Sequence, residues 1–167
     1  MVPLQIHFRK GGRLGANAFA LPNGAIVLTD EMIKLARHDD ELLAVVAHEA
    51  GHVARRHGVQ RIIQDSLLAF AIMAVTGDVS GTSQIFLGLP VILTELAYSR
   101  DFEHEADRYA LDYLQSQQIP PRRFADLMRR LQHEKRPDDP GTEGRWSNYL
   151  STHPDTEERL RRFEAPQ

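Results

Sequence analysis

Two histidines four residues apart, His48 and His52, lie inside a stretch, residues 39–65, that contains no proline. Apolar residues recur through this stretch at spacings of three and four, which is the pattern of an amphipathic helix. Three acidic residues at its start favour a helix N-terminus at Asp39. Because residues four apart share one face of a helix, both imidazoles can contact a single metal ion. We therefore predict one long helix, Asp39–Asp65, that carries a pair of metal ligands.

A small antiparallel β-sheet is expected near the N-terminus. Leu4–Arg9 alternates in the manner of a strand. Two further apolar runs, Ala16–Leu21 and Ala25–Thr29, flank Pro22-Asn23-Gly24, and Asn-Gly is a strong hairpin signal. The rest of the chain indicates helices, so the predicted fold class is α+β, mainly helical. Besides the long helix, the expected helices are Asp30–Arg37, Leu93–Gln117, Arg122–His133 and Pro154–Phe163.

Length, charge and cysteine content narrow the class of protein. A chain of 167 residues suits one domain, residues 1–167. A net charge of −3 argues against nucleic acid as a partner. The sequence has no cysteine, which excludes disulfides and any zinc site that needs thiolate. Residues 1–5 lack the features of a signal peptide, so we expect this domain to be a segment of a longer protein.

Two apolar segments, Leu67–Thr76 and Ile85–Leu93, are shorter than the ~18 residues of a membrane-spanning helix. We expect two buried helix pieces joined by a turn at Gly77–Thr82. The alternative is an apolar lip that faces a membrane or an apolar substrate. A stretch rich in proline, glycine and aspartate, Arg136–Trp146, is expected to form a mobile loop.

The residue after the first histidine, Glu49, points beside the expected metal ion and is placed to act as a general base for its water. Zinc needs a third protein ligand and an open position for water. A deformylase-type site needs cysteine, and a metzincin needs glycine and histidine where this chain has Arg55 and Gly58. His57 is one residue out of register and is expected to be structural.

A glutamate on a second helix remains as the third ligand. Glu103 and Asp107 are four residues apart and share a helix face, whereas Glu105 points elsewhere. Glu103 can therefore bind the metal while Asp107 reaches a ligand histidine, whose tautomer it would fix. The alternative is an exposed carboxylate pair beside Arg100 and Arg108.

These motifs resemble a metallopeptidase family that includes HtpX, the periplasmic protease BepA and the type I CAAX prenyl endopeptidase. The matching pieces are HEAGHVARRH (48–57), SRDFEHEADRYA (99–110), THP (152–154) and ANAFALPNGAIVLTD (16–30). The resemblance covers nearly the whole chain and implies a zincin-like domain with one Zn²⁺ held by His48, His52 and Glu103. It also implies that Asp107 contacts His48.

Further roles follow from the same resemblance. Asn17-Ala18-Phe19 is similar to the edge-strand segment that holds an extended substrate, and an unpaired strand edge suits that task. His153 is expected either to donate to the oxyanion of the tetrahedral intermediate or to serve as a fourth ligand that displaces water. Arg100 is expected to pair with Glu103 or Asp107.

The sequence thus predicts a zinc metalloendopeptidase that binds a protein or peptide as an extended strand, with Glu49 activating water. The alternative is a latched, zinc-stabilised binding or chaperone-like module with little protease activity. The prenyl-protein protease itself is disfavoured because it has several transmembrane helices. By analogy with the family, we expect a bacterial cell-envelope protein, periplasmic and anchored to the membrane by a segment outside this chain.

Overall fold

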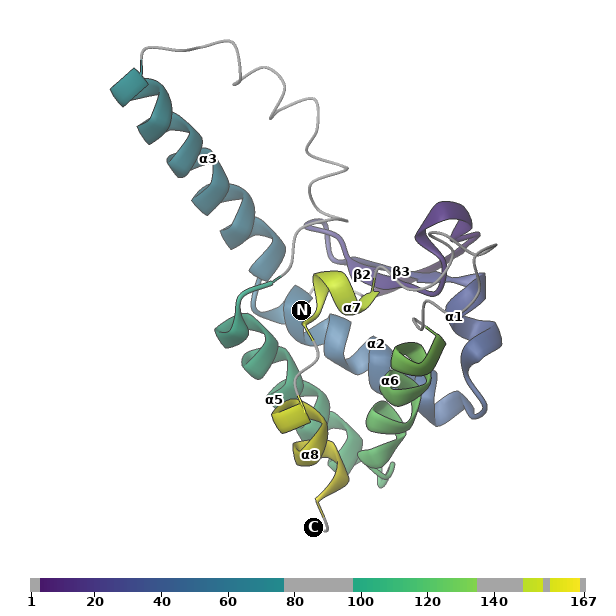
Figure 1. Ribbon diagram of the computed structural model, residues 1–167. Coiled ribbons are helices and arrows are strands. Elements are labelled where there is room, and N and C mark those ends of the chain that lie inside the picture. The colour runs from purple at the N-terminus through teal and green to yellow at the C-terminus, as the bar shows by residue number, and fades with distance from the viewer. Residues whose placement is uncertain (1–3, 77–97, 135–148, 155–156, 166–167) are drawn as a thin grey trace.

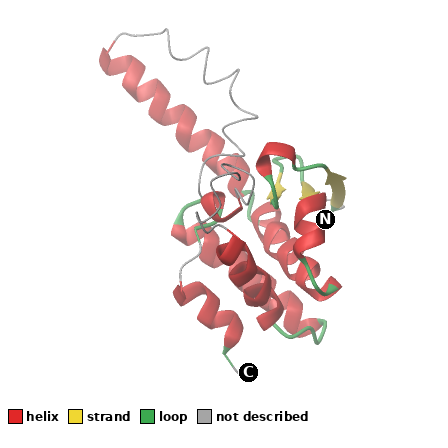
Figure 2. Ribbon diagram, turned by 45° about the vertical axis from the view of Figure 1, so that its right-hand side comes forward, coloured by secondary structure: helices red, strands yellow, loops and turns green. Residues whose placement is uncertain are grey.

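The helix that carries His48 and His52, α2 (Asp39–Ala54), runs through the middle of the protein, as Figure 1 shows. The structure is a computed structural model, and it describes residues 4–76, 98–134, 149–154 and 157–165. Helices make up most of the described chain, and a three-stranded sheet lies to one side of them (Figure 2). The predicted α+β, mainly helical class is confirmed.

The other helices in the described chain follow in sequence order. They are the 3-10 turn η1 (Gly12–Leu14), α1 (Asp30–Leu35), α3 (His57–Thr76), α5 (Arg100–Ser116), α6 (Arg122–Glu134), α7 (Tyr149–Thr152) and α8 (Glu157–Glu164).

The sheet is mixed, and the prediction of a purely antiparallel sheet is wrong for one pair. Its order is β1 (Gln5–Arg9), β3 (Ala25–Thr29), β2 (Ala18–Ala20). The predicted hairpin joins β2 to β3 in antiparallel pairing, and Gly24 adopts a φ of 90° in its turn. β1 instead runs parallel to β3, because the chain crosses from β1 through η1 and β2 before β3 begins. β2 is thereby left at an edge of the described sheet.

The predicted long helix breaks after the second histidine. α2 ends at Ala54, and Arg56 takes a left-handed conformation with a φ of 56° before α3 begins at His57. Such a conformation costs a non-glycine residue about 1–2 kcal/mol. Burial of His57, which stacks on Phe102 with ring centroids 4.2 Å apart, accompanies the break and offsets this cost. The break turns His57 back toward α2.

A glycine lets α5 lie close against α2. A Cβ atom on Gly51 would be only 2.8 Å from the Cα of Ala106 and 3.0 Å from its carbonyl oxygen. Gly51 lies between the two histidines of α2, and Ala106 lies between Glu103 and Asp107 of α5. The close approach therefore brings the two predicted motifs face to face.

The third predicted helix begins later than expected. α5 starts at Arg100 with Ser99 as its N-cap, whose hydroxyl accepts a hydrogen bond from the Phe102 N–H at 3.2 Å. Residues 93–97 of the predicted helix lie outside the described residues. The chain just before α5 is extended, and the Tyr98 N–H donates to the Thr152 carbonyl at 2.9 Å. This contact attaches α7 to the start of α5.

The C-terminal helices close the core over α2. α6 begins after Pro120-Pro121, as predicted, and α8 packs against it. Arg129 of α6 joins the two by ion pairs to Glu164 at 2.6 Å and to Glu157 at 3.1 Å. The buried core is formed by residues of β2, β3, α1, α2, α5, α6, α7 and α8, and its largest side chains include Phe124, Leu127, Met128, Leu131, Tyr149, Leu160 and Phe163.

α3 projects away from the rest of the protein (Figures 1 and 2). The segment Leu67–Thr76 forms its second half, and the expectation of a buried helix there is wrong for the side chains that are described. Leu67 is 63% exposed and Phe70 is 62% exposed, because no described element packs on that face. Ile85–Leu93 lies outside the described residues, as does Arg136–Trp146. None of the described helices is long and apolar enough to cross a membrane.

Candidate metal centre

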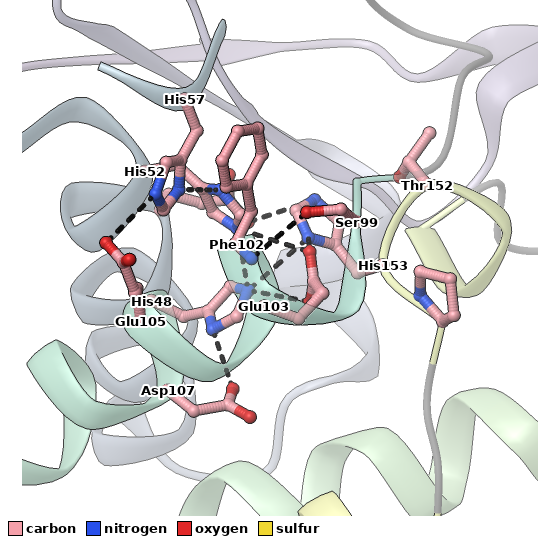
Figure 3. A network of polar contacts seen from close by, with 12 residues as sticks. His48, His52, His57, Ser99, Phe102, Glu103, Glu105, Asp107, Thr152 and His153 are labelled. Carbon is pink, nitrogen blue, oxygen red and sulfur yellow. Dashed lines mark hydrogen bonds and ion pairs between the residues drawn. The ribbon is translucent and has the colours of Figure 1, made fainter. Parts of the chain in front are cut away.

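Four buried side chains from three parts of the chain converge on one point (Figure 3). They are His48 and His52 of α2, Glu103 of α5 and His153, which directly follows α7. One ligand atom from each lies within 4.8 Å of all the others. None of the four side chains is more than 2% exposed. The structure thus brings together the three predicted ligands and His153.

The spacing of these atoms suits a metal ion of the size of zinc. Bonds of ~2.0–2.1 Å at tetrahedral angles put ligand atoms about 3.3 Å apart. His48 Nε2 lies 3.1 Å from His52 Nε2 and 3.4 Å from Glu103 Oε2. His153 Nδ1 lies 3.3 Å from His48 Nε2 and 3.0 Å from Glu103 Oε1. Three imidazoles and a carboxylate, with no thiolate, are a donor set that zinc accepts, so the residues fit such an ion.

The second nitrogen of each α2 histidine also has a neighbour. His48 Nδ1 lies 3.1 Å from Asp107 Oδ1, the contact expected for Asp107. His52 Nδ1 lies 3.0 Å from His57 Nδ1, and the His52 ring stacks on Tyr98 with centroids 4.0 Å apart. Neighbours of this kind hold an imidazole in one orientation and tautomer. Because the chain breaks at Arg56, His57 turns toward the centre and contacts the candidate ligand His52.

Arg159 of α8, which the sequence analysis missed, takes the position expected for Arg100. Its Nη1 lies 2.7 Å from Glu103 Oε2, and its Nη2 lies 2.6 Å from Asp107 Oδ1. Arg100 is exposed and forms no ion pair with any residue in the described part of the chain. The expectation that Arg100 pairs with Glu103 or Asp107 is therefore wrong. The Arg100 side chain, at the first turn of α5, is exposed. α8 instead places Arg159 against Glu103 and Asp107.

The sequence of α8 does contain a signal that Arg159 is buried. Leu160 and Phe163 are the only large apolar residues of α8, and they define its buried face. Arg159 is four residues before Phe163, so it shares that face, whereas Arg161 is 75% exposed. An arginine on the buried face of a helix requires carboxylate partners.

Glu49 faces the same point from α2 but makes few contacts. Its side chain is fully buried, and neither carboxylate oxygen forms a hydrogen bond within the described residues. His153 Nε2 lies 3.4 Å from its Oε1. Burial raises the pKa of the Glu49 carboxyl. A buried carboxylate without donors, beside a cluster of metal-ligand type, is what a general base requires.

Comparison of the sequence with known protein families agrees with this geometry. The profile of the peptidase family M48 matches residues 11–167, which includes every residue of the centre. The chain belongs to peptidase family M48. The resemblance inferred from the two helical motifs is thereby confirmed.

Three relatives of this M48 family member illustrate the match. The metalloprotease LoiP of Escherichia coli is 33% identical over 147 residues, 86% of this chain and 55% of LoiP. The mitochondrial metalloendopeptidase OMA1 of Schizosaccharomyces pombe is 29% identical over 150 residues, 89% of this chain and 42% of OMA1. The beta-barrel assembly-enhancing protease of E. coli is 29% identical over 164 residues, 86% of this chain and 31% of that protein. The chain spans about half or less of the length of these relatives.

Burial and neighbouring charges shift the pKa values of three side chains in the M48 centre in different directions. Burial lowers the pKa of His48, but the carboxylates of Asp107 and Glu103 outweigh it and raise that pKa to about 9. Burial holds the pKa of His52 well below its ordinary value. Burial also raises the pKa of Glu103, but its contacts with His153, His48 and His52 outweigh this and hold the pKa well below the ordinary range. In the metal-free protein, the His48 imidazole therefore carries a proton at neutral pH.

The segment expected to hold substrate lies beside the M48 centre. Ala18 and Phe19 belong to β2, the strand at the sheet edge, and Asn17 directly precedes it. A small cavity next to this strand is lined by Ala20 and His52, among others. The Asn17 side chain is buried, and its amide atoms have no hydrogen-bond partner within the described residues.

Proposed function

We propose that this M48 metalloprotease is a zinc-dependent endopeptidase that cleaves internal bonds of protein substrates, with Glu49 as the general base. The observation that carries the proposal is the convergence of four ligand atoms within 4.8 Å beside a buried Glu49. Zinc is supported by the donor set, which contains imidazole and carboxylate but no thiolate. His48, His52 and Glu103 hold the ion.

The chain's own residues then divide the chemistry among them. When bound, zinc polarises the scissile carbonyl and lowers the pKa of the attacking water toward ~7. Glu49 accepts a proton from that water and returns it to the leaving amine nitrogen. Asp107 and Arg159 keep His48 and Glu103 in place. Burial of the whole cluster strengthens each of these interactions.

Substrate binding is proposed at the edge of β2. An extended peptide can pair with the backbone of Ala18 and Phe19, whose strand has no neighbour on that side within the described sheet. The unsatisfied amide of Asn17 is available to a substrate carbonyl or N–H. This arrangement favours an unfolded or extended segment of a protein as the substrate.

The setting that we propose is protein quality control at the membrane or in the envelope of a bacterium, with the catalytic domain on the periplasmic side. Support comes from similarity to LoiP and to the beta-barrel assembly-enhancing protease, both of E. coli. Membrane attachment would come from a segment outside this chain. Fractionation of cells that express the full-length gene product tests this setting, and recovery in the cytosol contradicts it.

The decisive experiment is Glu49→Gln. This variant removes the base but no ligand, so it should keep one zinc per chain and lose cleavage of casein or of an autolysis site. Zinc content is measured by mass spectrometry of the purified protein. Glu164→Gln, an exposed glutamate on α8, serves as the control and should cleave normally. Casein cleavage by Glu49→Gln at the wild-type rate would show that the proposed mechanism is wrong.

A second candidate function is a latched zinc module in which His153 serves as a fourth ligand. It is favoured by the position of His153 Nδ1, which lies among the other ligand atoms at 3.0 Å from Glu103 Oε1 and 3.3 Å from His48 Nε2. His153→Ala separates the two functions when both proteins are loaded with zinc. A latch predicts a gain in casein cleavage, and an oxyanion donor predicts a loss.

A further inference from the structure

Tyr149 is a buried tyrosine whose hydroxyl has no hydrogen-bond partner in the described structure. Its side chain is 0% exposed, and it is the largest fully buried side chain among the described residues. A buried hydroxyl without a partner costs about 1–3 kcal/mol. Phenylalanine would fill the same space without this cost, so the hydroxyl calls for an explanation.

Glu49 is a buried acceptor that has no hydrogen-bond partner within the described residues. Neither of its oxygens completes a hydrogen bond within the described residues, although the carboxyl is fully buried. Burial raises the pKa of that carboxyl, and the Tyr149 hydroxyl opposes the rise as a nearby hydrogen-bond donor. The Tyr149 hydroxyl, a donor without an acceptor, is thus close to the Glu49 carboxylate, an acceptor without a donor.

The local backbone holds Tyr149 firmly in this place. The His153 N–H donates to the Tyr149 carbonyl at 2.8 Å, and the Thr152 hydroxyl donates to the same oxygen at 3.0 Å. The Tyr149 ring stacks on the His153 ring, with centroids 4.5 Å apart and planes inclined by 25°. His153 Nε2 in turn lies 3.4 Å from Glu49 Oε1. α7 and the residue after it therefore bring Tyr149 and His153 to the centre as one unit, beside Glu49.

We propose that Tyr149 is a positioning residue for the general base: its hydroxyl donates to one oxygen of Glu49 and directs the other toward the attacking water. This inference rests on the proposed role of Glu49. It goes further by assigning the orientation of that carboxylate to α7, from a part of the chain a hundred residues away from the histidine motif. Tyr149 transfers no proton, so loss of its hydroxyl should slow the reaction without abolishing it.

The test is Tyr149→Phe, which removes the hydroxyl and keeps the ring that stacks on His153. We expect kcat on a fluorogenic peptide to fall about 10- to 100-fold, because a carboxylate misplaced by about 1 Å loses roughly that much rate. KM and zinc content should stay at wild-type values, and the thermal midpoint should not fall, because phenylalanine removes a buried hydroxyl that lacks a partner. Tyr113→Phe removes a hydroxyl from a partly exposed tyrosine on α5 and controls for the substitution itself. This control should leave kcat unchanged.

A kcat for Tyr149→Phe within twofold of wild type would overturn the inference. A fall in kcat that comes with lost zinc or a lower thermal midpoint would also overturn it, because the hydroxyl would then be structural. A second variant carries 3-fluorotyrosine at position 149, which keeps the donor, and it should retain at least half of the wild-type kcat. The proposed function fails separately, if Glu49→Gln cleaves, so the two failures can be told apart.

Discussion

Arg159 and Asp107 form a buried, bidentate ion pair between α8 and α5. Arg159 Nε lies 2.7 Å from Asp107 Oδ2, and Nη2 lies 2.6 Å from Oδ1. Only 4% of Arg159 and 1% of Asp107 is exposed. The same guanidinium lies against Glu103 and donates to the Pro154 carbonyl at 2.8 Å, one residue after His153. One cation therefore connects a candidate ligand, the carboxylate behind His48 and the turn that carries His153.

Replacement of Arg159 by methionine should destabilise the metal-free protein strongly. The variant leaves the carboxylates of Glu103 and Asp107 buried without their cation, and loss of one partner of a buried pair costs about 3–5 kcal/mol. Urea denaturation in the presence of a chelator measures the free energy of unfolding of the metal-free protein. Arg159→Lys keeps the charge but not the planar guanidinium, so its free energy of unfolding should lie between those of the wild type and of Arg159→Met.

Arg161→Met is the matched control for Arg159→Met. Arg161 lies two residues along α8, is 75% exposed and faces Glu157 at 3.8 Å. An exposed pair of this kind contributes about 0–1 kcal/mol, so the control should unfold close to wild type. Equal losses for the two methionine variants would contradict the assignment of the buried ion pair to Arg159.

The parts of the centre that could be predicted from the sequence are those fixed by helical spacing. His48 with His52, and Glu103 with Asp107, are pairs four residues apart, and a helix places such pairs on one face whatever surrounds it. Arg159 and Tyr149 could not be found in this way, because only the packing of α7 and α8 brings them to the centre. The pairing expected for Arg100 rests on the family resemblance, and a resemblance at that position does not show which way the side chain points.

The break at Arg56 and the parallel strand could not be predicted for a related reason. Residues 54–62 contain no proline, so local propensity favours one continuous helix. The left-handed Arg56 is tolerated because His57 becomes buried against His52 and Phe102, which are contacts of the tertiary structure. β1 alternates like any edge strand, and its direction relative to β3 depends on the path of the intervening chain.

Gly51→Ala should destabilise the protein although alanine is the better helix former. The added methyl group would meet the backbone of Ala106 at 2.8 Å and the Tyr109 Cβ at 3.1 Å, so α5 has to shift. Overpacking of this kind costs about 1–3 kcal/mol. Because Glu103 and Asp107 move with α5, zinc affinity should fall as well. Thermal unfolding and zinc titration measure the two effects.

Gly58→Ala supplies the matched control for the Gly51 variant. A Cβ at this position, in the first turn of α3, meets nothing closer than 3.8 Å. The substitution should be neutral or stabilising by up to about 1 kcal/mol, because it removes backbone freedom from the unfolded chain. A Gly51 variant as stable as the Gly58 variant would show that α2 and α5 are not in close contact.

Zinc binding should release about one proton per chain between pH 7 and 8. His48 carries that proton, since its pKa in the metal-free protein is raised to about 9, whereas the pKa of His52 and that of Glu103 are both lowered. The apparent zinc affinity should therefore rise about tenfold per pH unit through this range and level off above pH 9. Calorimetric titrations in two buffers of different ionisation enthalpy count the protons.

Asp107→Asn tests the source of the released proton. Loss of the Asp107 charge removes an interaction that raises the His48 pKa, so the variant should release fewer protons and show a shallower pH dependence of zinc affinity. Proton release that is zero in the wild-type protein, or unchanged in Asp107→Asn, would contradict the assignment to His48.

His57→Phe should weaken zinc binding about 10- to 100-fold without unfolding the protein. When His52 binds zinc through Nε2, its Nδ1 carries the hydrogen, and the acceptor 3.0 Å away is His57 Nδ1. His57 Nε2 must then carry a hydrogen, and it lies 3.5 Å from Glu105 Oε2, so a chain of contacts runs from that carboxylate to the ligand. Phenylalanine keeps the stack on Phe102 but cannot accept a hydrogen bond from His52.

His133→Phe is the control for this variant. It lies at an exposed position on α6 and should bind zinc normally in a chelator competition assay. Equal zinc affinity for the two variants would mean that His52 is oriented without His57, and that Tyr98, stacked on its other side, is sufficient.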